Sequence, residues 1–142
     1  MPSTTTSARP TSREEASPRV GASYAVQISW LLVAAFTLSV VHTVYAAVAG
    51  LEAPDFTLTT PITWIFYGTA FAMAALARLD RRWVAWVVTA YLTVVLLIGV
   101  FYYPTTFEPH QQTTFGWFEN DVYLGLLMIA YYLGFLRLRQ DR

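Results

Sequence analysis

The chain has 142 residues, of which 56% are hydrophobic and 13% are charged, and its formal net charge at pH 7 is zero. A soluble domain carries roughly twice that share of charged residues. This composition excludes an ordinary soluble globular domain and a disordered chain, and the neutral charge without a basic face excludes a nucleic-acid-binding protein. Because cysteine is absent, disulfides, thiolate metal sites and thiol nucleophiles are excluded as well.

The first 23 residues are rich in Ser, Thr and Pro and hold almost no large apolar side chain. Such a segment cannot bury enough apolar surface to offset the conformational entropy that it would lose on ordering. The sequence therefore predicts a disordered cytosolic tail over residues 1–23. A second, very short cytosolic tail is expected over residues 139–142.

Four apolar runs lie between these tails and predict a transmembrane domain over residues 24–138. The runs cover residues 26–50, 61–77, 83–103 and 122–138. Each has the length of about 17–25 helical residues that crosses a bilayer core about 30 Å thick. The predicted fold is an all-α integral membrane protein, a four-helix transmembrane bundle.

The arginines predict the orientation of this bundle. All nine cationic residues are Arg, and they lie in the N-terminal tail, between the second and third runs, and at the C-terminal end. Lys and Arg accumulate on the cytoplasmic side of membrane proteins, so both termini are predicted inside and the two Arg-free loops outside. The absence of lysine is typical of GC-rich codon usage, and we expect a multi-pass protein of a bacterial plasma membrane.

The first run allows a second interpretation. An Arg-bearing tail, an apolar run and then Ala47-Val48-Ala49 resemble a cleavable signal peptide. The apolar stretch before that point is longer than the usual ~7–15 residues of a signal peptide, which favours a permanent first helix.

Small residues predict where the helices touch, because lipid supplies no hydrophobic drive between helices. The second run carries two stripes of small residues on opposite sides, Gly68–Ala72–Ala75 and Ala70–Ala74–Ala77. A helix with two such faces can contact neighbours on both sides. We therefore expect the second run to be the most buried of the four.

His42 is the one histidine inside an apolar run, and it shares a helical stripe with Ser39. An ionisable residue at membrane depth is a candidate functional residue. The simpler interpretation is a structural His42 that forms a hydrogen bond to a hydroxyl across the bundle. Haem ligation by two histidines would need a second intramembrane His, which a single chain does not supply, so no cofactor is expected.

The predicted outer loop, residues 104–121, holds the remaining candidates for chemistry: Glu108, His110, Glu119 and Asp121. Their oxygen and nitrogen atoms suit a divalent cation. Glu119 and Asp121 are also explained as carboxylates at the start of the fourth helix, where they favour the positive end of the helix dipole. We therefore predict no metal site, and the Phe and Trp residues of the loop lead us to expect that it lies on the membrane surface or folds over the mouth of the bundle.

These observations predict a protein that is not an enzyme, since no run contains a Ser–His–Asp set and none contains an acidic residue. We expect an accessory or structural subunit of a membrane assembly, whose partners are the lipid bilayer and other membrane proteins or further copies of itself. The alternative is a component of a small-solute transporter or channel that uses His42 and the outer loop 104–121.

Overall fold

The computed structural model describes residues 20–53, 56–106 and 113–140, and this part of the chain is helical, with a single isolated β-bridge between Ala53 and Phe56. The helices are α1 (Val20–Ala49), α2 (Pro61–Leu76), α3 (Arg82–Leu97) and α4 (Thr114–Gln140). A π-helical turn (Ile98–Tyr102) and a 3-10 turn (Tyr103–Thr105) extend α3. Three segments are long and apolar enough to cross a membrane: Ser23–Ala49, Arg82–Thr105 and Thr114–Gln140.

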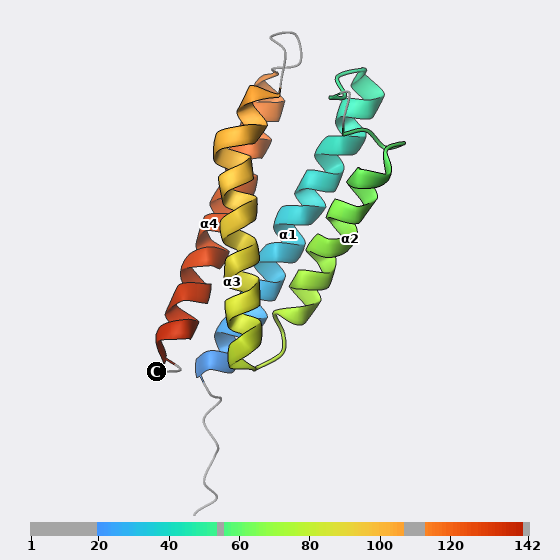
Figure 1. Cartoon of the computed structure of the whole chain (residues 1–142). Coiled ribbons are helices and arrows are strands. Elements are labelled where there is room, and N and C mark those ends of the chain that lie inside the picture. Colours follow the sequence, from blue (N-terminus) through green and yellow to red (C-terminus); the bar gives the residue numbers. More distant parts are fainter. Residues whose placement is uncertain (1–19, 54–55, 107–112, 141–142) are drawn as a thin grey trace, which may run out of the picture.

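The four helices lie roughly along one axis (Figure 1), with α1 and α3 starting at the same end and α2 and α4 returning to it. α1 packs against both α2 and α4, and α3 packs against α4, whereas α2 and α3 touch little. α1 and α4 are therefore the two helices that pack extensively against two neighbours each.

Phe36, in the middle of α1, is the centre of the core. Its side chain is fully buried, and its ring meets the rings of Phe66 and Phe71 on α2, Tyr91 on α3 and Tyr123 on α4 at centroid distances of 5.9–6.5 Å. Edge-to-face aromatic pairs add about 0.5–1.5 kcal/mol each beyond the area that they bury. One residue of α1 thus joins all four helices at this level.

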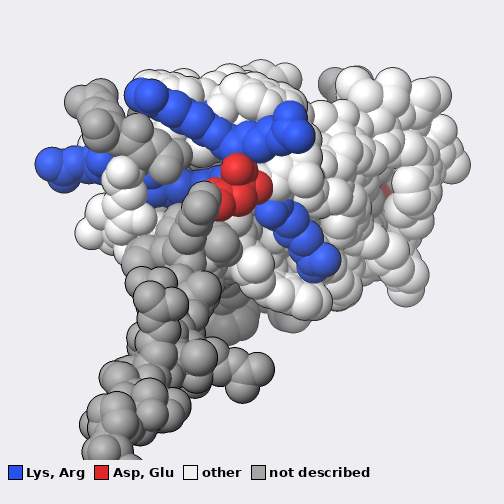
Figure 2. Space-filling model, turned by 90° about the horizontal axis from the view of Figure 1, so that it is seen from below, with Lys and Arg blue, Asp and Glu red and all other residues white. Residues whose placement is uncertain are grey.

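The described arginines gather at the end where α1 and α3 begin, around an acidic group (Figure 2). Arg137 of α4 is only 2% exposed there. Its guanidinium donates to the carbonyl oxygens of Ala77 and Leu79 at 3.3 and 2.8 Å and to Asp80 Oδ1 at 3.3 Å. A cation is favourable at a helix C-terminus, where carbonyl groups lack helical partners, so Arg137 fastens the end of α4 to the end of α2.

The helices are longer at two ends than the apolar runs predicted. α1 begins at Val20, so the last residues of the predicted disordered tail are helical. Residues 1–19, residues 107–112 of the predicted loop 104–121, and the C-terminal residues 141–142 lie outside the described residues. α4 begins at Thr114 rather than near residue 122. Helical hydrogen bonds do not require apolar side chains, so hydropathy marks the lipid-facing part of a helix and not its ends.

The prediction that the second run is the most buried is wrong. Ala70, Ala74 and Ala77 are buried, but the opposite stripe is exposed. A Cβ built on Gly68 would meet no atom within 4 Å. Small residues mark where a helix can be approached closely, and no other described segment approaches Gly68 on this face of α2.

The small residues of α4 behave differently. Ala130 and Gly134 are both buried, and a Cβ on Gly134 would lie 2.9 Å from Thr89 Oγ1 of α3. At the other end of the same contact, a Cβ on Gly99 would lie 2.9 Å from Leu124 Cδ2. The two glycines let α3 and α4 pack closely along their length.

Candidate functional site

His42 and Glu119 form the candidate site. The Nδ1 atom of His42 on α1 lies 2.9 Å from Oε2 of Glu119 on α4. Glu119 is 3% exposed and His42 is 23% exposed. His42 therefore pairs with a carboxylate and not with the hydroxyl that the sequence suggested.

Glu119 reaches this position because α4 starts early. Thr113 precedes the helix, and its Oγ1 accepts the N–H of Gly116 at 3.0 Å, as an N-cap residue does. Glu119 then falls about 8 Å inside the helix at 1.5 Å per residue. The predicted role of Glu119 as a group at the start of the fourth helix is wrong, because Thr113 occupies that position.

Gly116 of α4 faces the imidazole of His42. A Cβ on Gly116 would lie 3.5 Å from the ring atom Cε1 of His42, which is an ordinary contact, and 3.2 Å from Thr113 Oγ1, which is a tight one. The imidazole thus lies against the first turn of α4. The ring is then held next to the carboxylate that follows one turn later.

A cluster of hydroxyl groups lies beside the pair, on the α2 side of α1. The phenol of Tyr67 donates to the carbonyl oxygen of Ser39 at 2.9 Å. Its oxygen also lies 2.6 Å from Thr43 Oγ1 and 3.1 Å from Ser39 Oγ. Ser39, predicted to face a neighbouring helix together with His42, does so, but its partner is Tyr67.

The electrostatics of the site follow from its low exposure. A lone charge inside a membrane protein is costly, and paired groups reduce that cost. An imidazole and a carboxyl group that share one proton are neutral as a pair, whichever of them holds it. The second carboxylate oxygen, Oε1 of Glu119, is buried and has no hydrogen-bond partner among the described residues.

The other sequence-predicted candidates do not join this site. Glu108 and His110 lie outside the described residues. Asp121 is exposed on α4, two residues beyond Glu119. No group of three or more potential metal ligands occurs among the residues that the structure describes.

The sequence reasoning missed two buried ionisable side chains: Glu119, which contacts His42, and Arg137, which contacts the end of α2. A signal for both exists in the sequence. Steps of three and four residues from Ala130 and Gly134 lead back through Leu127 and Tyr123 to Glu119, and forward to Arg137. Residues at such steps share one face of a helix, so the buried face of α4 was readable beyond the ends of its apolar run.

Comparison of the chain with protein-family models, with curated proteins and with solved structures found no match. The fold class and the site geometry are therefore the basis for a functional proposal.

Proposed function

We propose that the protein is a four-span accessory subunit of a membrane assembly, and that the outward face of α2 receives a transmembrane helix of another chain. The observation that carries the proposal is the exposed stripe on α2 formed by Gly68, Ala72 and Ala75. In lipid, small residues of this kind let two helix backbones approach closely.

The course of the chain supports α2 as the fourth span. α1 and α3 start at the Arg-rich end and run the same way (Figure 1), so the segment between them has to return across the bilayer. α2 has 16 residues and is about 24 Å long at 1.5 Å per residue, less than the bilayer core of about 30 Å. Association with another helix is one way in which a short span relieves this mismatch.

The cytoplasmic placement of the Arg-rich end belongs to the same proposal. The described arginines at that end are Arg78, Arg81, Arg82, Arg137 and Arg139. By the positive-inside rule this end faces the cytoplasm of a bacterial cell. The His42–Glu119 pair then lies in the outer half of the bundle. There it has a structural role between α1 and α4 and takes part in no reaction.

The test uses two matched glycines. Neither Gly68 on α2 nor Gly125 on α4 has an atom within 4 Å of a built Cβ, so Leu at either site should leave the fold of the chain intact. After purification in mild detergent, native mass spectrometry should find the parent and Gly125→Leu in a particle heavier than the 16.0 kDa chain. Gly68→Leu should be found alone.

The outcomes separate the alternatives. A Gly68→Leu protein that melts normally and keeps its partner would contradict the α2 surface. A particle whose mass is a multiple of the chain itself would show that the α2 face binds a second copy, and the accessory role would then be wrong.

A second candidate function, a component of a small-solute transporter, is favoured by the buried and unpartnered Oε1 of Glu119. A polar atom at that depth suits a cationic or hydrogen-bonding solute that enters from outside. The packing deeper in the bundle argues against conduction through a single chain. Beyond the His42–Glu119 pair, the interior is filled by Leu32, Phe36 and Leu127, each fully buried. Uptake of a small cationic solute into proteoliposomes would favour transport over the accessory role if it is lost in Glu119→Gln but kept in Asp121→Asn.

A further inference from the structure

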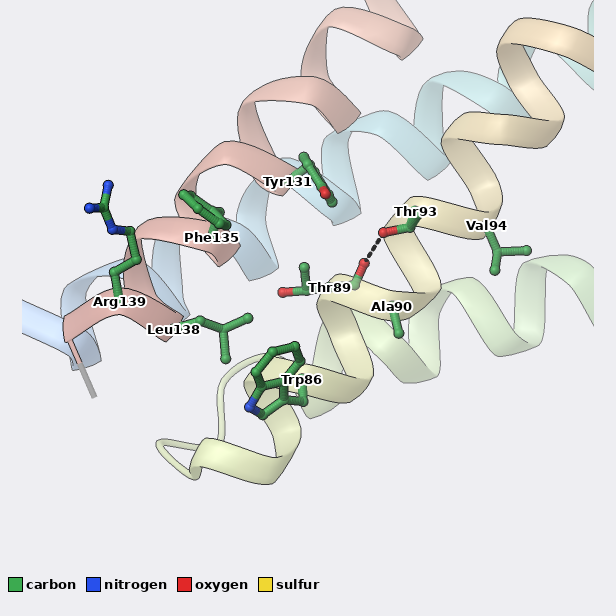
Figure 3. Close-up of a pocket in the computed structure, with 9 residues that line it drawn as sticks. All are labelled: Trp86, Thr89, Ala90, Thr93, Val94, Tyr131, Phe135, Leu138 and Arg139. Carbon is green, nitrogen blue, oxygen red and sulfur yellow. Dashed lines mark hydrogen bonds between the residues drawn. The ribbon is translucent and has the colours of Figure 1, made fainter. Parts of the chain in front are cut away.

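A groove of about 820 Å³ runs along the outside of the bundle between α3 and α4 (Figure 3). Its volume lies within the range of about 300–1,000 Å³ that is usual for small-molecule sites. The side chains that line the groove include Trp86, Thr89 and Ala90 of α3 and Tyr131, Phe135 and Arg139 of α4.

The groove has a floor of small residues and walls of aromatic rings. At the floor, Gly134 of α4 lies against Thr89 of α3, so the two backbones are close there. Trp86, Tyr131 and Phe135 stand at the sides and are 53%, 36% and 47% exposed. The groove is apolar, has aromatic walls and opens sideways. It therefore faces the region that lipid acyl chains occupy.

The groove runs along the helix axis and ends at the Arg-rich end of the bundle. From Val94 to Trp86 it follows about 12 Å of helix at 1.5 Å per residue, which is less than half of a bilayer core about 30 Å thick. It therefore stays within one leaflet, and it ends at Arg139 in the Arg-rich end of the bundle. Trp86 stands near the same end, where indole rings commonly mark the membrane–water interface.

Arg139 is available to an anion. Its guanidinium carbon lies 5.7 Å from the centre of the Phe135 ring, and no carboxylate in the described parts of the chain pairs with it. Arg137, by contrast, is committed to two carbonyl groups and Asp80. The two arginines are close in sequence but differ in what they can bind.

Thr89 adds a second observation at the floor of the groove. The residue is 8% exposed, and its hydroxyl has no hydrogen-bond partner among the residues described. It lies about 4.5 Å deeper along α3 than Trp86. Gly134 covers this hydroxyl, so the floor of the groove is closed at Thr89 and the opening lies between the aromatic side chains.

We propose that this groove binds an anionic glycerophospholipid of the leaflet at the Arg-rich end. The phosphate lies on Arg139, and one acyl chain lies between Trp86, Tyr131 and Phe135. Basic pockets between transmembrane helices on the cytoplasmic side bind lipid phosphate groups in this manner. The site is on the opposite side of α4 from α1 and does not involve the outward face of α2.

The test is native mass spectrometry of the purified full chain after incubation with phosphatidylglycerol or phosphatidylcholine of identical acyl chains. The parent should retain phosphatidylglycerol about fivefold to tenfold better, the ratio expected for about one charged contact. Arg139→Gln should lose this preference and retain both lipids equally. Arg82→Gln, which removes an exposed arginine at the same end outside the groove, should keep the preference of the parent.

A second variant separates the groove from surface charge. Ala90→Phe fills the groove and leaves every charge in place, so it should lose both lipids while its melting temperature stays that of the parent. Equal retention of the two lipids by the parent would overturn the proposal, and so would equal losses in Arg82→Gln and Arg139→Gln. Millimolar inorganic phosphate should not displace the lipid; binding of phosphate alone, or a polypeptide found in the groove by crosslinking, would show another occupant and overturn it.

Discussion

α2 and α4 both run antiparallel to α1 and pack on it, yet they contribute very differently to the bundle. α4 is buried against two neighbours and carries a buried acid near its start and a buried base near its end, Glu119 and Arg137. α2 packs mainly on α1 and leaves half of its small residues exposed. The difference teaches that small residues alone do not show which face of a helix is covered, whereas ionisable residues on the same stripe as small ones do, because such residues need a partner inside the protein.

The largest effect is expected from Arg137, which connects the two helices. Arg137→Leu would leave the carbonyl groups of Ala77 and Leu79 without their donor and Asp80 without its cation. We expect the free energy of unfolding to fall by about 3–5 kcal/mol, the cost of breaking a buried charged contact. Denaturant or thermal melts in detergent would measure it, with the exposed Arg82→Gln as a control that should change by less than about 0.5 kcal/mol.

The next effect concerns the contact of α4 with α1. Glu119→Leu would leave the imidazole of His42 without its partner and should cost about 1–3 kcal/mol. Glu119→Gln keeps a hydrogen-bonding group at the same place and should cost clearly less. Equal losses in the two variants would show that the carboxylate contributes more than a hydrogen bond, and equal stability of all three proteins would contradict the structural role of the pair.

Substitution of one glycine in each helix compares α2 with α4 directly. Gly134→Ala on α4 would place a Cβ 2.9 Å from Thr89 Oγ1, and overpacking of this kind costs about 1–3 kcal/mol. Gly68→Ala on α2 meets nothing within 4 Å and gains up to about 1 kcal/mol of helix propensity. The melting temperatures should therefore move in opposite directions. A shift in the same direction for both would contradict the different burial of α2 and α4, and Thr89→Ala should rescue Gly134→Ala.

More of the fold than of the candidate site could be predicted from the sequence. Four apolar runs predicted four helices in the order in which they occur, and three of the segments are long and apolar enough to cross a membrane. The runs did not predict that α4 begins before Glu119, because the carboxyl group there pairs with His42, which is 77 positions earlier in the chain. A pairing of that kind is set by tertiary packing and leaves no mark in a local hydropathy pattern.

The burial of α2 was mispredicted for a related reason. Its two small stripes are chemically alike, and only the position of α1 decides which of them is covered. Gly134 and Gly68 likewise differ in what lies opposite them: Thr89 lies opposite Gly134, and no atom lies within 4 Å of a Cβ built on Gly68. Small-residue spacing predicts a surface that can be packed, and the neighbouring helix determines whether it is.

The smallest effect is expected at the N-terminal ends of the two helices. α2 begins with Pro61, which has no N–H group to satisfy, whereas α4 relies on the Thr113 hydroxyl, which accepts the N–H of Gly116. Thr113→Ala should cost about 1 kcal/mol and Thr113→Ser much less, because serine is an equally good N-cap residue. Hydrogen exchange of the amides in the first turn of α4 should rise in Thr113→Ala, while the amides of α2 stay unchanged. If exchange in that turn is the same in the alanine variant and the parent, the early start of α4 does not depend on this cap, and the position of Glu119 has to be explained by its pairing with His42 alone.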